Sequence, residues 1–205
     1  MTVLLTKKGE PNMETISAKE ALERLKQGNQ RLLNGEAKGP GQFSEQRREE
    51  LTQKARAGQA PYAIILSCAD SRVPVELLFD AGSGELFVVR VAGNVANTST
   101  IASIEYAVAH LGTKLVVVMA HETCGAVAAA IAGGDAGKNL NTLIGYIQPV
   151  VGSGDDTVDE VSRRNARQSA DRLLNESDII RTAVESGDVE ITTAFFHFDG
   201  EVEFE

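Results

Sequence analysis

The chain of 205 residues contains no tryptophan, and aromatic residues make up only 5% of it. No apolar run approaches the ~20 residues that a membrane-spanning helix needs. The lysines near the N-terminus are followed by no apolar stretch adequate for a secretory signal. We therefore expect no membrane association, and a cytoplasmic location follows as the default.

Positive charge is also scarce, with 20 basic residues against 29 acidic ones and a formal net charge of -9. An acidic surface repels phosphate backbones, so we expect no nucleic-acid partner. The length suits one domain, and a chain of this size can bury a core large enough to fold without disulfides.

Cysteine is rare as well, with only Cys68 and Cys124 in the whole chain. A disulfide between them is disfavoured in a cytoplasmic protein. They can then be buried apolar thiols, a redox pair or metal ligands. The redox reading fits worst, because the two are 56 positions apart (124 minus 68) and form no Cys-x-x-Cys motif.

Apolar residues are concentrated in three short continuous runs rich in β-branched residues, at 62–67, 86–91 and 115–120. Continuous rather than alternating runs indicate parallel strands that are buried on both faces. A later strand is expected at 189–196, followed by a turn and a short strand at 202–204. Helices are expected at 18–34, 45–57, 99–111, 125–132, 140–150, 158–174 and 177–186. This order predicts an α/β fold with a parallel sheet at its core.

Polar residues with unusual chemistry follow two of these strands. Cys68, Asp70 and Arg72 come directly after the strand at 62–67, and His121 and Cys124 follow the strand at 115–120. In parallel α/β sheets, ligands bind beyond the carboxyl ends of the strands. The sequence therefore predicts one site at this edge.

A metal ion is the ligand that these residues favour. His121 and Cys124 are three apart, and at the start of a helix such residues share a face. Cys68 can supply a third ligand from the neighbouring strand. Two thiolates and an imidazole favour zinc, and three protein ligands leave a fourth position open for a water molecule that ionises near pH ~7.

Asp70 and Arg72 are expected to decide what occupies the fourth position on the metal. A guanidinium can hold a carboxylate by paired hydrogen bonds. Arg72 would thus keep Asp70 off the metal, and Asp70 would orient a zinc-bound hydroxide. We expect the fourth position to be open at neutral pH and not filled by Asp70.

Each feature alone has an ordinary explanation, as a core cysteine, a satisfied histidine or an ion pair at a turn, but their combination favours a metal site. The remaining histidines are expected on a helix surface (His110) and at a hairpin edge (His197).

The two motifs together resemble the signature of the β-class carbonic anhydrases. The first is Cys-x-Asp-Ser-Arg at residues 68–72, and the second is His-x-x-Cys-Gly at residues 121–125. The similarity extends over roughly 59–133, and includes Gly84-Glu85-Leu86-Phe87 and Ala92-Gly93-Asn94. The pair is far more specific than either motif alone.

The resemblance assigns roles position by position. It implies one zinc ion per subunit and a catalytic pair beside it. It also implies substrate-binding positions, of which Phe87 and Tyr106 can equally be ordinary core residues. The implied zinc ligands are Cys68, His121 and Cys124, the catalytic pair is Asp70 and Arg72, and the substrate-binding positions are Gln59, Phe87, Tyr106 and Gly125.

The family fold implies a central sheet of about four parallel strands plus an antiparallel C-terminal strand, flanked by helices. We expect one domain over 1–205, with an N-terminal helical arm (1–58) that packs on a partner subunit and a zinc-binding α/β core (59–205). The resemblance further implies a homodimer or homotetramer with its active site at the subunit interface. Gln59, Phe87 and Tyr106 can then serve the partner's zinc.

Some positions depart from the family pattern. Ile65 stands where members with an allosteric bicarbonate site have tryptophan, and Phe198 stands where they have tyrosine. Both differences argue against that regulation. Val91 and Ala120 also differ from the common residues, at positions outside the expected chemistry.

The resemblance implies a carbonate dehydratase that hydrates carbon dioxide reversibly to bicarbonate and a proton through zinc-bound hydroxide. One alternative is hydrolysis of carbonyl sulfide or carbon disulfide on the same scaffold, although those relatives resemble a first motif with Met and without the Ser found at Ser71. A non-catalytic structural zinc module is disfavoured, because closed structural sites usually have four protein ligands.

Overall fold

A five-stranded sheet forms the centre of the computed structural model, which describes residues 15–39, 44–54, 58–152 and 154–205. The strand order is β2-β1-β3-β4-β5. Four strands are parallel, and β5 pairs antiparallel with β4. The expected α/β fold and its antiparallel C-terminal strand are both confirmed. The strands are β1 (Ala63–Ser67), β2 (Leu86–Arg90), β3 (Leu115–His121), β4 (Glu190–Phe196) and β5 (Val202–Phe204).

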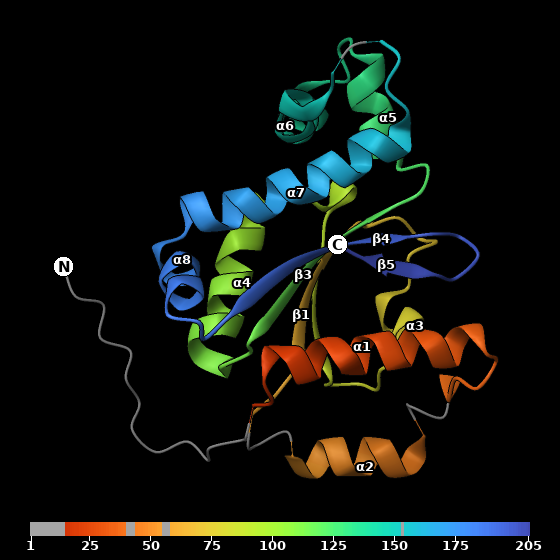
Figure 1. Ribbon diagram of the computed structural model, residues 1–205, viewed down its shortest axis with the longest axis vertical. Coiled ribbons are helices and arrows are strands. Elements are labelled where there is room, and N and C mark those ends of the chain that lie inside the picture. The colour runs from red at the N-terminus through yellow and green to blue at the C-terminus, as the bar shows by residue number, and fades with distance from the viewer. Residues whose placement is uncertain (1–14, 40–43, 55–57, 153) are drawn as a thin grey trace.

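Helices cover both faces of this sheet (Figure 1). One face is covered by α1 (Ala18–Leu33) and α3 (Val75–Leu78), and the other by α4 (Thr98–Leu111), α7 (Val158–Glu176) and α8 (Asp178–Glu185). A third group packs around the carboxyl ends of β1 and β3: η3 (Ala92–Asn94), α5 (Gly125–Ala132), α6 (Lys138–Ile147) and η4 (Gln148–Val150). The remaining helix, α2 (Glu45–Lys54), is anchored by Arg47, which donates to the carbonyl of Ser83 at 3.2 Å.

The continuous apolar runs are explained by burial of alternate residues on opposite faces. Ile65 and Val117 pack in the core under α1, whereas Ile64 and Val116 pack under α4 and α7. Every residue of β1 and β3 is buried. Since successive side chains of a strand point to opposite faces, a strand covered on both faces must be apolar at every position.

The first helix packs closely on its own sheet. A Cβ atom at Gly28 would lie 1.9 Å from the carbonyl oxygen of Phe79, so α1 can approach α3 only with glycine there. Asn29 donates to the carbonyls of Leu78 and Gly200 and accepts from the backbone N–H of Val202. The helix is therefore part of this chain's core, and its contact with a partner subunit stays a prediction.

Several elements differ from the sequence expectation. The short helix α3 was not expected, and the helix expected at 140–150 begins at Lys138 and passes at Gln148 into a 3-10 turn around Pro149. Residues 55–57 of the second expected helix lie outside the described residues. No described helix is long and apolar enough to cross a membrane.

Candidate metal centre

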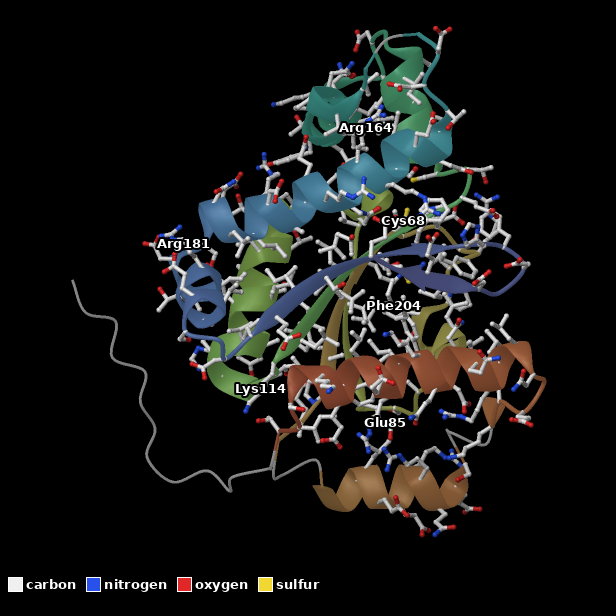
Figure 2. All side chains as sticks on the ribbon, viewed as in Figure 1. Cys68, Glu85, Lys114, Arg164, Arg181 and Phe204 are labelled. Carbon is white, nitrogen blue, oxygen red and sulfur yellow. The ribbon has the colours of Figure 1, made fainter. Side chains whose placement is uncertain are left out.

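The predicted ligands come from two neighbouring strands. Cys68 directly follows β1, His121 is the last residue of β3, and Cys124 is the N-cap of α5. Figure 2 shows Cys68 at the opposite end of the sheet from Lys114, which precedes β3. The expected carboxyl edge of the sheet therefore carries this site.

The three side chains converge as predicted. Their ligand atoms all lie within 4.8 Å of one another, the two sulfurs are 4.0 Å apart, and all three residues are buried. The expected reason for convergence was wrong, because His121 belongs to a strand and shares no helix face with Cys124. A tight turn brings them together instead, with Thr123 in the left-handed region at φ 48°. That conformation is strained for a β-branched residue.

His121 has a free nitrogen suited to a metal. Its Nδ1 lies 2.8 Å from the carbonyl oxygen of Glu122, so Nδ1 carries the hydrogen and Nε2 carries the lone pair. Nε2 is buried and has no hydrogen-bond partner among the described residues. A buried nitrogen without a partner is costly, and a metal ion would satisfy it. The donor set of two sulfurs and this nitrogen fits zinc.

The two neighbouring thiols have shifted pKa values, in opposite directions. The hydrogen bond from Cys124 lowers the pKa of Cys68 to about 4, and His121 and the N–H groups of Asp70 and Gly93 add to this against the effect of burial. The pKa of Cys124 is raised, chiefly by the hydrogen bond with Cys68 and then by burial. The pair thus gives up its first proton readily and holds the second. A divalent cation between the sulfurs would replace that second proton.

Asp70 lies beside the ligands but is held by Arg72. Its Oδ2 is 3.9 Å from Nε2 of His121. The guanidinium donates to both carboxylate oxygens, and the Arg72 backbone N–H donates to Oδ1. The hydrogen bonds from Arg72 hold the pKa of Asp70 far below its usual range. Arg72 also lies 4.4 Å above the ring of Phe198, which is 5.9 Å from the His121 ring.

A second arginine fixes the backbone of the first motif. Arg90, at the end of β2, donates from Nε to the carbonyl of Cys68 at 2.9 Å and from Nη2 to the carbonyl of Asp70 at 2.5 Å. Both carbonyls belong to the segment that presents the Cys68 sulfur and the Asp70 carboxylate. The positions of these two side chains therefore depend on the neighbouring strand.

Comparison with known proteins agrees with this geometry. The sequence model of the family described as carbonic anhydrase matches residues 63–202. Carbonic anhydrase 2 of Mycobacterium tuberculosis is 36% identical over 201 residues, covering 92% of this chain and 91% of that protein. The carbonic anhydrase of Mycolicibacterium smegmatis is 36% identical over 202 residues, covering 94% of each.

This chain belongs to the carbonic anhydrase family. Its structure resembles that of a tetrameric β-carbonic anhydrase from Sordaria macrospora, with a TM-score of 0.70, 27% identity and coverage of 79% of this chain and 89% of that one. The β-class resemblance is therefore confirmed. Carbonate dehydratase, the enzyme class expected from the sequence, is the class for which these relatives are named.

Three of the four substrate-binding positions that the resemblance implies lie away from the ligands within one chain. Gln59 is exposed and precedes β1, whereas Cys68 follows it. Phe87 is paired with Ile64, four residues before Cys68, which corresponds to roughly 13 Å along the strand. Tyr106 is 48% exposed, and its ring lies 6.4 Å from that of Phe87.

Gly125, the fourth of these positions, is exposed. An added Cβ there would meet nothing within 4 Å. A single chain therefore gives no steric reason for glycine at this position. Its role in binding substrate stays a prediction.

The structure also gives His197 partners that the sequence did not indicate. Its Nδ1 lies 3.0 Å from Oε1 of Glu122, and its Nε2 lies 3.6 Å from Oε2 of Glu203. Glu122 accepts in addition from the backbone N–H of Phe198. These contacts tie the β4–β5 hairpin to the residue next to His121. His110 is exposed, as expected, and stacks on Tyr106.

A separate groove of about 690 Å³ lies between α4 and α8, where its lining includes Gly112, Lys114 and Ile179. It opens near the amino ends of β3 and β4 and shares no lining residue with the metal-ligand cluster. The groove is therefore distinct from the candidate metal site, which stays at the carboxyl edge of the sheet.

Proposed function

We propose that this chain is a zinc enzyme that hydrates carbon dioxide reversibly to bicarbonate and a proton. The observation that carries the proposal is the buried set of Cys68, His121 and Cys124, with Asp70 held beside it by Arg72. Membership of the carbonic anhydrase family supports the same reaction.

Zinc bound by these three residues would supply Lewis acidity, which lowers the pKa of water enough to give a nucleophile at neutral pH. Asp70 would accept a hydrogen bond from the attacking oxygen and turn one of its lone pairs toward carbon dioxide. The carboxylate suits this role because the hydrogen bonds from Arg72 keep it ionised. An ionised carboxylate only accepts hydrogen bonds, so it fixes which way the hydrogen of the attacking oxygen points.

Arg72 would keep Asp70 from becoming a fourth zinc ligand. The two side-chain hydrogen bonds measure 2.9 and 2.7 Å, and the guanidinium is also packed over Phe198. Binding zinc through Asp70 would require breaking this arrangement. We therefore propose an open fourth position at neutral pH.

The substrate pocket is proposed to form between two copies of the chain. Gln59, Phe87 and Tyr106 lie too far from the ligands of their own chain, and Phe87 and Tyr106 leave part of their rings accessible to a partner. The tetrameric relative from Sordaria macrospora supports assembly of this kind. Assembly as a dimer or tetramer and a cytoplasmic location both stay predictions.

A stopped-flow carbon dioxide hydration assay with parallel zinc analysis tests the function. We expect zinc close to one ion per chain and hydration activity in the purified protein. Cys124→Ser should lose both, because a hydroxyl is a poor ligand for zinc in place of a thiolate. Thr142→Ala, which removes an exposed hydroxyl on α6 that donates to the carbonyl of Lys138, is the control and should keep both. Activity that persists in metal-free protein would contradict the proposal.

The alternative substrates gain no specific support from the relatives described above, which are named for carbonic anhydrase. Carbonyl sulfide and carbon disulfide can be assayed with the same preparation. Faster turnover of either compound than of carbon dioxide would favour the hydrolase function over carbon dioxide hydration.

A further inference from the structure

The sulfur of Cys68 accepts hydrogen bonds from two backbone N–H groups. Gly93 donates at 3.2 Å and Asp70 at 3.4 Å, and the Gly93 contact is buried. Hydrogen bonds of this kind stabilise negative charge on a thiolate and tune the metal that it binds. The geometry of Gly93 therefore bears directly on the metal site.

Gly93 is held in a demanding conformation. Its φ is +69°, and the next residue, Asn94, is also in the left-handed region at φ 43°. A Cβ atom at Gly93 would lie 2.8 Å from Cδ1 of Ile147 and 3.2 Å from Cβ of Ala126. Two successive left-handed residues are unfavourable in isolation, so contacts from elsewhere must hold this loop.

One such contact comes from α7, a helix outside both signature motifs. Nδ2 of Asn165 donates to the carbonyl oxygen of Gly93 at 2.6 Å, and Asn165 is completely buried. The orientation of the amide follows from this partner, because a carbonyl oxygen can only accept. The two peptide groups that flank the Gly93 Cα are thus both fixed, one by the Cys68 sulfur and the other by Asn165.

The same face of α7 holds the following residues of the loop. The hydroxyl of Ser169 accepts from the backbone N–H of Ala96 at 3.3 Å, and Nε of Arg172 donates to the Ala96 carbonyl at 3.0 Å. Asn165, Ser169 and Arg172 are spaced four and three apart, which places them on one side of a helix. Of these three, Asn165 bonds to the residue that contacts the sulfur.

We propose that Asn165 is a positioning residue for the metal centre, which holds the Gly93 N–H against the Cys68 thiolate. The inference rests on the proposed function, since it requires a metal bound through Cys68. Asn165 acts through Gly93 and touches neither metal nor substrate. Its loss should weaken the hydrogen bond to sulfur, which changes the electron donation from the thiolate to the metal. It should also let the Gly93 loop move away from Cys68, so that the site holds the ion less firmly.

The test compares Asn165→Ala with Ser162→Ala. Ser162 is also buried on α7, but the one hydrogen bond of its hydroxyl within the described part of the chain goes to the carbonyl of Val158 in the same helix. Each change removes one buried polar group from the same helix. If Asn165→Ala does not fold, Asn165→Ser takes its place, because the serine hydroxyl fills part of the space but does not reach Gly93.

Two readouts report on the site without activity. One is the sulfur-to-cobalt charge-transfer absorption of the cobalt(II)-substituted protein, and the other is the rate of zinc release to a chelator. We expect Asn165→Ala to shift the absorption band and to speed zinc release about tenfold, and Ser162→Ala to stay within about twofold of the wild type. Equal release rates in the two variants, or an unshifted band in Asn165→Ala, would overturn the positioning role.

The cobalt spectrum of the wild-type protein distinguishes failure of this inference from failure of the proposed function. A wild type with no sulfur-to-cobalt band would overturn the metal site itself, and the role of Asn165 with it. A normal band in the wild type that is unchanged in Asn165→Ala would overturn only the positioning role.

Discussion

Arg72 holds both carboxylate oxygens of Asp70, with Nε 2.9 Å from Oδ1 and Nη2 2.7 Å from Oδ2. The carboxylate is thereby kept ionised and turned toward the side of His121, where its Oδ2 lies 3.9 Å from Nε2. In this geometry Asp70 can accept a hydrogen bond from a group bound beside the three candidate ligands. The first prediction follows from this relationship.

Replacing Asp70 with asparagine should lower turnover about 10²-fold and leave zinc content unchanged. The amide has nearly the same shape, but it loses the charge and one of the two acceptor oxygens. Steady-state hydration kinetics with zinc analysis measure both effects. The matched control is Asp135→Asn, whose exposed carboxylate accepts, among the described residues, only from Gly137 and Asn141 at the start of α6. Wild-type turnover in Asp70→Asn would contradict the assigned role.

Mixing two inactive variants should restore activity if the site is shared between subunits. Gln59→Ala and Asp70→Asn each damage a different half of a shared site. A mixed dimer then contains one intact site and one doubly damaged site. Random reassociation of equal amounts should give about one quarter of wild-type activity. No recovery in mixed dimers shown to have formed would mean that Gln59 serves the site of its own chain, and full activity of Gln59→Ala alone would remove Gln59 from the site.

Gly93→Ala should destabilise the protein more than Gly112→Ala. Both glycines are in the left-handed region, with φ 69° and 67°. An added Cβ at Gly112 would meet its nearest atom, Cγ2 of Thr15, at 3.5 Å, whereas at Gly93 it would clash with Ile147 at 2.8 Å. Gly112→Ala should cost about 1–2 kcal/mol from the backbone alone.

The clash should add a further ~1–3 kcal/mol in Gly93→Ala. Urea unfolding measures the free energies of both variants. We also expect Gly93→Ala to release zinc faster, since the Cβ must push the N–H away from the Cys68 sulfur. Equal unfolding free energies for the two variants would show that the loop yields to the added methyl group.

The contact between His197 and Glu122 should stabilise the hairpin only within a limited pH range. Burial lowers the pKa of His197, but the hydrogen bond to Glu122 and its charge outweigh burial, so this pKa lies above the usual 6.5. The hydrogen bonds from Phe198 and His197 lower the pKa of Glu122 below the usual 4.5. The stabilisation is therefore fully present between these two usual values.

The stabilisation is lost as pH rises through the raised pKa of His197, and again as pH falls through the lowered pKa of Glu122. A double-mutant cycle with His197→Gln and Glu122→Gln measures it by urea unfolding of zinc-free protein. We expect a coupling of up to ~1 kcal/mol near pH ~5.5 and almost none near pH ~9. A coupling that is the same at both values would show that charge plays no part.

The sequence by itself predicted the sheet and the ligands. Continuous apolar runs occur where a strand is covered on both faces, as at Ile64 and Ile65, and this local pattern does not depend on the rest of the chain. Cys68, His121 and Cys124 were predicted because both cysteines follow such runs, and because the carboxyl ends of parallel strands meet at one edge. The turn before 202–204 predicted the β5 strand, whereas its antiparallel place in the sheet came from the family resemblance.

The tertiary structure alone decided how the ligands converge and which residues support them. The left-handed turn at Thr123 replaced the expected helical spacing, because a strand-to-helix turn is set by packing and not by residue type. The sequence carried no sign of the partners of Asn165 and His197, since each bonds to a residue more than 70 positions away. Hydrogen bonds between distant segments form only after the chain has folded, so residue types and spacings along the sequence do not specify them.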